Sequence, residues 1–148
     1  MNPAAKPDGS PDGRDPHRLG SKKILVVEDS PVLRECIAQL VLREGFCAET
    51  ARDGAEAWSA ICSKEFDMII TDHQMPKMTG LNLIRKVREA SIEAPCILIS
   101  SDLPEPETTL MPLIRPGATV AKPFKFETLM KVVISLLKQG ALEEMPKA

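Results

Sequence analysis

The chain of 148 residues carries 19 Lys and Arg against 21 Asp and Glu, which gives a net charge of −2. A chain of this length fits one domain with a substantial core. Its near-neutral charge offers no bulk electrostatic reason to bind nucleic acid or anionic lipid directly. The sequence contains neither an apolar run of the roughly 18 residues that span a bilayer nor a signal peptide. We therefore expect a cytoplasmic protein without membrane insertion.

The four cysteines stand singly among apolar neighbours and form no CxxC pair and no cluster with metal-ligand spacing. We interpret them as small buried hydrophobic side chains in a reducing compartment rather than as a disulfide framework. They are Cys36, Cys47, Cys62 and Cys96.

Composition divides the chain into three parts. Residues 1–21 are rich in Pro, Gly and Asp and almost lack large apolar side chains, so they predict a disordered leader. The short polar stretch 140–148 predicts a flexible tail. The folded unit is expected to span residues 22–139.

Apolar runs alternate with amphipathic segments along the folded unit. Ser30 and Pro31 are typical of a helix start, Gly45 of a helix end, and Asp53 of a second helix start. Near-continuous apolar strands separated by helices predict a doubly wound α/β fold, with a parallel sheet covered on both faces. The predicted strands are residues 23–27, 46–51, 66–71, 95–100 and 117–121, with helices from residues 31, 54 and 80 and around 126–136.

The segment between Ser100 and Gly117 fits this alternation poorly. A fourth helix belongs here, but four prolines interrupt it, and a proline inside a helix costs about 3 kcal/mol. We expect a short or irregular helix, with apolar residues between Leu103 and Arg115 either packed or offered to a partner.

Polar residues follow four of the predicted strands at their carboxyl ends, where open parallel sheets bind ligands. Clustered carboxylates repel each other unless a cation lies among them, and Mg²⁺ favours such an oxygen-rich site. One carboxylate would remain to act as a nucleophile towards a phosphoryl donor, while a lysine and a hydroxyl stabilise the transferred group. These residues are Glu28, Asp29, Asp72, Ser100 and Lys122.

The ordered set EDSP, DHQMPKMTG, ILIS and AKPF resembles the receiver domain of two-component response regulators, of the type found in chemotaxis regulators. The resemblance covers about residues 22–139. It implies a flavodoxin-like sheet in the order 2-1-3-4-5 with five helices. It also implies a partner histidine kinase or histidine phosphotransfer protein and a further protein target that the sequence does not identify.

The resemblance also assigns roles to residues. It makes Asp72 the phosphoacceptor, with Glu28, Asp29, Asp72 and the backbone carbonyl of Gln74 holding Mg²⁺. Ser100 becomes the switch hydroxyl and Lys122 the lysine of the site, followed by Pro123, which usually forms a cis peptide in the family. Read without the resemblance, Ser100 could instead cap the next turn and Lys122 could be a solvated surface lysine.

Four further positions bear on this interpretation. Receivers commonly have an aromatic residue three positions before the lysine, and this chain has Thr119, so the usual aromatic readout is missing. We expect His73 to pack or to face solvent, and Trp58 to belong to the core. The side chain of Gln74 could reach the phosphoryl group and influence its hydrolysis, depending on the path of the loop.

The sequence lacks residues that several other functions require. A haloacid-dehalogenase-type phosphatase needs a second acid two residues after the nucleophile, where this chain has Gln74. A dinucleotide-binding enzyme needs a glycine-rich turn after the first strand, and a nucleotide hydrolase needs GxxxxGK[ST]; neither motif is present. Two alternatives stay open within the receiver interpretation, namely a receiver segment of a hybrid histidine kinase and a pseudo-receiver scaffold that acts without phosphorylation.

Overall fold

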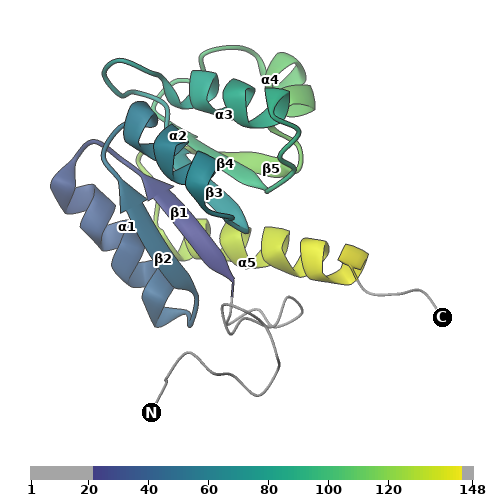
Figure 1. Ribbon diagram of the computed structural model, residues 1–148. Helices are drawn as coiled ribbons and strands as arrows, with labels where there is room; N and C mark the ends of the chain where they lie inside the picture. The colour runs from purple at the N-terminus through teal and green to yellow at the C-terminus, as the bar shows by residue number, and fades with distance from the viewer. Residues whose placement is uncertain (1–21, 145–148) are drawn as a thin grey trace.

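A five-stranded parallel sheet in the order β2-β1-β3-β4-β5 forms the centre of the molecule (Figure 1). The structure is a computed structural model that describes residues 22–144, so the expected leader lies outside the described residues. The strands are β1 (Lys23–Val27), β2 (Cys47–Ala51), β3 (Met68–Asp72), β4 (Cys96–Ser100) and β5 (Gly117–Ala121). The flavodoxin-like doubly wound sheet expected from the sequence is thereby confirmed.

Five helices cover the two faces of the sheet. Helices α1 (Pro31–Arg43) and α5 (Phe126–Glu144) lie on one face, and α2 (Gly54–Ser63), α3 (Gly80–Glu89) and α4 (Glu107–Ile114) lie on the other (Figure 1). Helix α5 continues past residue 139, where the sequence pattern placed the end of the folded unit. Residues 145–148 of the expected tail lie outside the described residues.

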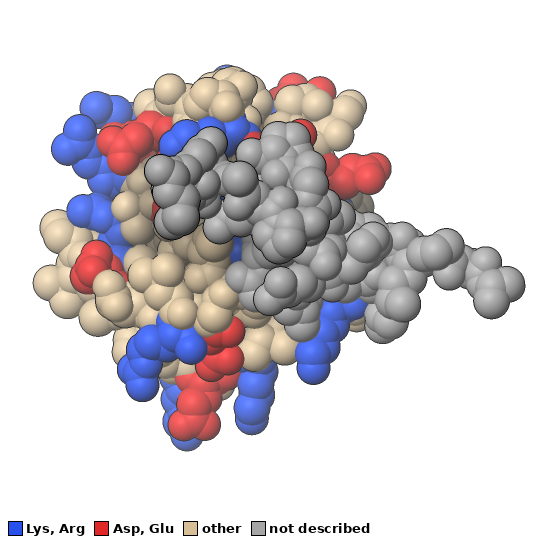
Figure 2. Space-filling view, turned by 60° about the horizontal axis from the view of Figure 1, so that its bottom comes forward, with Lys and Arg blue, Asp and Glu red and all other residues tan. Residues whose placement is uncertain are grey.

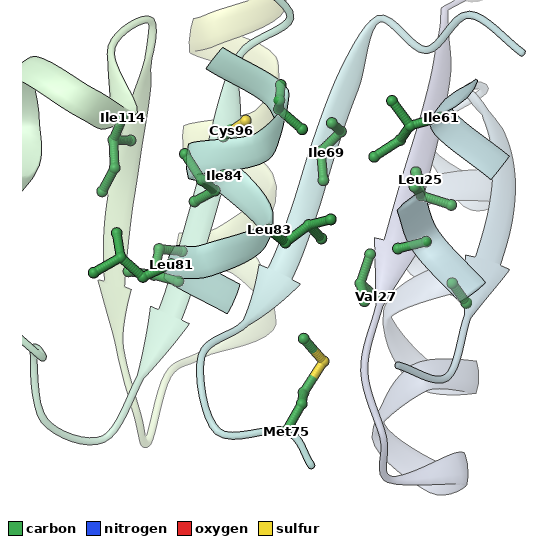
Figure 3. Close-up of a cluster of buried hydrophobic side chains, with 14 of the residues drawn as sticks. Leu25, Val27, Ile61, Ile69, Met75, Leu81, Leu83, Ile84, Cys96 and Ile114 are labelled. Atoms are coloured by element: carbon green, nitrogen blue, oxygen red, sulfur yellow. The ribbon is translucent and has the colours of Figure 1, made fainter. Parts of the chain in front are cut away.

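The central strands β1, β3 and β4 each contribute alternate residues to two separate core clusters, because successive side chains of a strand point to opposite faces. Leu25, Val27 and Ile69 pack beneath α2, α3 and α4 (Figure 3). Ile24, Val26 and Ile70 pack beneath α1 and α5. This burial on both faces explains why the strands read as continuous apolar runs in the sequence.

The helix boundaries follow the capping signals of the sequence. Ser30 accepts a hydrogen bond from the amide of Leu33, and Asp53 accepts one from the amide of Glu56. Gly45 has φ +95°, and the amide of Phe46 donates to the carbonyl of Val41, so α1 ends in a Schellman motif.

Helix α4 is short, as the prolines predicted, and Pro112 lies inside it. Its own residues Leu110 and Ile114 are buried in the core cluster beneath α2, α3 and α4, and Leu113 packs against that cluster. Leu103, before the helix, is exposed. The apolar residues of this segment are therefore mostly packed rather than offered to a partner.

The cysteine interpretation was wrong for most positions. Of the four, Cys96 alone is buried, and burial raises the pKa of its thiol to about 11. The other three lie on outward-facing positions of α1, β2 and α2. The prediction failed because a small apolar side chain does not show which face of a helix or strand it occupies. The large hydrophobic side chains of Val32 and Phe126 are also exposed, by 75% and 42%.

Trp58 is half-buried against the core cluster, with the ammonium of Lys86 5.3 Å from its ring centroid, so it lies at the edge of the core rather than inside it. On the face of the molecule shown in Figure 2, Lys and Arg alternate with Asp and Glu, in keeping with the near-neutral charge. Among the described residues, no helix is both long enough and apolar enough to cross a bilayer.

Candidate functional site

Three carboxylates meet at the carboxyl edge of the sheet, where β1 and β3 lie side by side. Glu28 and Asp29 follow β1, and Asp72 is the last residue of β3. One carboxylate oxygen of each lies within 4.8 Å of the others. The structure therefore brings together the three acids that the sequence placed at strand ends.

Two of these acids are removed from solvent. Glu28 is 2% exposed and Asp72 is 3% exposed, whereas Asp29 is exposed. Burial penalises a charged carboxylate, and it is the main reason that the pKa of Glu28 rises to about 7. The neighbouring Asp29 and Asp72 raise the pKa further, while the amide of Ser30 and the ammonium of Lys122 oppose the rise.

Lys122 supplies a positive charge to this edge from the end of β5. Its Nζ lies 2.7 Å from Asp72 Oδ1 and 3.8 Å from Glu28 Oε1. Burial acts to lower the pKa of Lys122, but the interactions with Asp72 and Glu28 outweigh it, so the pKa is raised. Lys122 is therefore the counter-charge of the acidic site and not a solvated surface lysine. The peptide between Lys122 and Pro123 is cis, as the resemblance implied.

The backbone around Asp72 is fixed by its neighbours. The buried Thr71 hydroxyl donates to the carbonyl of Asp72 at 2.9 Å. A Cβ at Gly80, the first residue of α3, would collide with that same carbonyl, so α3 begins against the backbone of Asp72 only because residue 80 is glycine. Sequence reasoning missed the roles of both residues; the glycine at a helix start was the available signal for Gly80.

The backbone of Glu28 is fixed in a similar way. Its amide donates to the carbonyl of Ala51 at 3.1 Å, and its carbonyl accepts from the guanidinium of Arg34 at 3.0 Å. Its carboxylate accepts from the amide of Ser30 at 3.0 Å. The contribution of Arg34, one turn into α1, has no local signal in the sequence.

Ser100 lies at the end of β4, beside the site but engaged elsewhere. It is buried, its carbonyl accepts from the amide of Lys122 at 2.9 Å, and its hydroxyl donates to the carbonyl of Asp102. The hydroxyl therefore makes the turn-capping bond that the sequence allowed as an alternative to a switch role.

The residues after Asp72 form the loop between β3 and α3. The side chain of Gln74 is exposed. His73 is half-buried, and its carbonyl accepts from the amides of Met75 and Gly80, so it closes the loop rather than joining the acids. This agrees with the packing role expected for His73.

The three-acid cluster fits a hard divalent cation. Glu28 Oε1 and Asp72 Oδ1 are buried and accept no well-directed hydrogen bond from the described residues, although the Lys122 ammonium is close to both. Buried oxygens without a partner are costly, and a cation coordinated by them would offset that cost. The acidic residues at this edge can therefore hold a metal ion.

Comparison with known families decides the class of protein. The response regulator receiver domain matches residues 24–134. The chain belongs to this family. A receiver is a signalling domain of two-component systems and not a classical enzyme, and the acids, Lys122 and Ser100 of this receiver occupy the strand ends from which the resemblance was first inferred.

Solved structures agree with this assignment. The receiver resembles the chemotaxis protein CheY4 of Vibrio cholerae with 30% identity and a TM-score of 0.71, over 78% of this chain and 98% of that one. It also resembles the response regulator TrrA of Thermotoga maritima, solved in complex with Mg²⁺ and BeF, with 30% identity and a TM-score of 0.70 over the same shares.

Curated relatives are longer proteins. The gliding motility regulatory protein of Myxococcus xanthus is 39% identical over 87 residues, which are 57% of this chain and 11% of that protein. The transcriptional regulatory protein DltR of Streptococcus agalactiae is 27% identical over 120 residues, which are 81% of this chain and 54% of that protein. The chain thus spans about half, or much less, of the curated relatives it matches.

Proposed function

We propose that this receiver accepts a phosphoryl group on Asp72 from the phosphohistidine of a histidine kinase or histidine phosphotransfer protein in the cytoplasm. The observation that carries the proposal is the pair of buried carboxylates, Glu28 and Asp72, facing one ammonium, that of Lys122. Such an arrangement is costly to the fold and suits a site that receives a cation and an anionic group together.

Each residue of the site has a part in the transfer. An oxygen of Asp72 attacks the phosphorus atom, the phosphorus–nitrogen bond breaks, and its electron pair stays on the partner's imidazole. Lys122, already 2.7 Å from Asp72 Oδ1, turns its ammonium to the oxygens of the transferred group. Glu28, Asp29, Asp72 and the backbone carbonyl of Gln74 would hold Mg²⁺, which when bound neutralises negative charge on the phosphoryl group.

Ser100 couples this chemistry to the surface. Its hydroxyl donates to the carbonyl of Asp102, and it must leave that carbonyl to donate to a phosphoryl oxygen. The exchange frees the backbone between β4 and α4, and this loop then offers a changed surface to a downstream protein target. Hydrolysis of the phosphoryl aspartate within the same site returns the receiver to its starting state.

Two features bear on the alternatives. Thr119 is half-buried on β5 where receivers commonly have an aromatic residue, which favours a scaffold that acts without phosphorylation as the second candidate. The chain covers only a small share of the curated relative from Myxococcus xanthus. A receiver segment of a hybrid histidine kinase would suit this coverage equally well. Neither feature alters Asp72, which would receive the phosphoryl group, or the acids beside it.

The proposal is tested with beryllofluoride, which mimics a phosphoryl group on an aspartate, followed by amide spectra in the presence of Mg²⁺. We expect the amide signals of Ser100, Lys122 and the loop between β4 and α4 to shift, and the Asp72→Ala variant to show no shift. Spectra that do not change, or that change equally in Asp72→Ala, would instead support the phosphorylation-independent scaffold.

A further inference from the structure

Gly54, the first residue of α2, lies directly against the loop that follows Asp72. A Cβ built at Gly54 would be 2.7 Å from the Cβ of Met78, 2.9 Å from its Sδ and 3.0 Å from its Cγ. Met78 belongs to the segment between β3 and α3, far from Gly54 in sequence. The absence of a side chain at residue 54 therefore allows α2 and this loop to approach each other.

A rotation of the Met78 side chain would not relieve the contact. The Sδ and Cγ atoms can move aside by changing the side-chain torsions, but the position of a Cβ atom is fixed by the backbone. A Cβ at residue 54 would thus force the backbone of α2 or that of the loop to shift.

The first turn of α2 is firmly held. Asp53 accepts from the amide of Glu56 at 2.7 Å, and the carboxylate of Glu56 in turn accepts from the amide of Arg52 at 3.1 Å. Ala57, one turn along, is fully buried against the sheet. Because these contacts hold the first turn of α2 in place, we expect the loop to yield to a Cβ at residue 54.

The loop carries residues of the acidic site at its other end. Its backbone turns through Lys77, which has φ 71°, and Figure 3 shows Met75 directed from the loop towards the sheet near Val27. Met75 and Gly80 donate their amides to the carbonyl of His73, the residue next to Asp72. A displacement at Met78 is therefore transmitted through a short, closed loop to the backbone of residues 72–74.

We infer that Gly54 is a positioning residue for the phosphoacceptor site, acting through Met78 to hold the loop that carries Gln74 next to Asp72. The three atoms nearest to a Cβ at Gly54 all belong to Met78 and none to the acids or Lys122, so the effect depends on the Cβ of residue 78. The inference rests on the proposed function, since it concerns the geometry of the same metal and phosphoryl site.

The test is a set of variants at residues 54 and 78. In Gly54→Ala, we expect the Mg²⁺ dissociation constant to rise about tenfold, the usual minimum cost of disturbing the support of a metal site. We also expect the amide signals of residues 74–79 to shift in the protein without Mg²⁺. In the Met78→Gly background, residue 78 has no Cβ to collide with, so Gly54→Ala should no longer weaken Mg²⁺ binding. In the Met78→Ala background the Cβ of residue 78 remains, so Gly54→Ala should still weaken Mg²⁺ binding.

Gly45 provides a matched control. It lies at φ +95°, where alanine is strained, but a Cβ there would meet no atom within 4 Å. Gly45→Ala should lower the stability of the fold while leaving the Mg²⁺ dissociation constant and the signals of residues 74–79 unchanged.

The outcomes separate the inference from the function on which it rests. Equal Mg²⁺ affinity and unchanged loop signals in Gly54→Ala would overturn the inference, as would an equal effect of Gly54→Ala in the Met78→Gly and Met78→Ala backgrounds. If Gly54→Ala does not fold, recovery of folding and Mg²⁺ affinity in Gly54→Ala with Met78→Gly supports the inference, and failure to recover overturns it. If the protein without substitutions binds no Mg²⁺, the proposed function is contradicted. The amide signals of residues 74–79, measured without Mg²⁺, would still test the inference about Gly54.

Discussion

Glu28 is a buried acid whose ionisation works against the fold. Because its pKa is raised from 4.5 to about 7, the folded state keeps a proton that the unfolded chain has lost between these values. Folding stability from this group is therefore fully present below pH 4.5 and decreases as the pH rises through 7. A bound divalent cation would reverse the preference, because it stabilises the charged carboxylate.

We predict that Glu28→Gln raises the free energy of unfolding of the metal-free protein by about 1–2 kcal/mol at pH 8, because it removes the cost of a buried charge. Denaturant unfolding between pH 4 and pH 8 measures the effect, and the gain should vanish near pH 4. Glu89→Gln, at an exposed position of α3, is the control and should show no such change. A gain that is the same at every pH would contradict the account.

Lys122 would compete with a bound metal ion for an oxygen of Asp72. Its Nζ lies 2.7 Å from Asp72 Oδ1, and a cation bound by Glu28 and Asp72 must share the space with this ammonium. Removal of the ammonium should therefore favour the metal and disfavour the transfer of an anionic group.

For Lys122→Met we expect Mg²⁺ to bind about tenfold more tightly, equivalent to about 1.4 kcal/mol, and phosphorylation by acetyl phosphate to become slower. Calorimetric titration and mass spectrometry measure the two effects. Lys86→Met, on the exposed side of α3 beside Trp58, should alter neither. Weaker Mg²⁺ binding in Lys122→Met would show that the ammonium supports the metal site instead of competing with it.

At the scale of single elements, α4 is held mainly at its C-terminal end. It begins after Pro106 without a side-chain cap, and Pro112 removes one backbone donor from its interior. At the other end, the guanidinium of Arg88 on α3 donates to the carbonyls of Leu113 and Ile114 at 3.1 and 2.6 Å. It also donates to the carbonyls of Ile92, Ala94 and Pro116. One side chain thus satisfies the last carbonyls of a helix whose own sequence favours it weakly.

Arg88→Met should therefore lower the free energy of unfolding by about 2–4 kcal/mol, because it leaves several partly buried carbonyls without a donor. Arg85→Met lies on the same helix and loses an exposed ion pair with Glu105, so it should change stability by less than about 0.5 kcal/mol. Denaturant unfolding compares the two variants. Equal losses would mean that Arg88 acts through its charge at the surface and not through these carbonyls.

Sequence reasoning worked best for elements with strong local signals. The first and fifth strands have the predicted bounds, and the caps at Ser30, Asp53 and Gly45 lie where expected. The irregularity of α4 followed from its prolines. Its anchoring by Arg88 did not, because a contact between residues so far apart along the chain has no local signature.

At the scale of the whole molecule, the sheet order determines the site. The neighbours β1 and β3 bring Glu28 beside Asp72, and β4 and β5 bring Ser100 beside Lys122. The acids could be predicted because the carboxyl ends of parallel strands share one edge of the sheet. The importance of Gly54 could not be predicted, since it lies in a contact with Met78 that only the packed structure shows. The bond from the Ser100 hydroxyl to the carbonyl of Asp102 was open to prediction as a turn cap, because it joins residues only two apart in the sequence.

The most direct test of the account is the intact mass of the protein after incubation with acetyl phosphate and Mg²⁺, quenched at short times. We predict the addition of one phosphoryl group, which is lost in Asp72→Ala and after chelation of Mg²⁺. Asp67 directly precedes the first residue of β3, at the end of the strand opposite to Asp72, so the Asp67→Ala variant should still be phosphorylated. A folded, Mg²⁺-binding protein that gains no phosphoryl group at any time, or that gains one equally in Asp72→Ala, would contradict the assignment of Asp72 as phosphoacceptor.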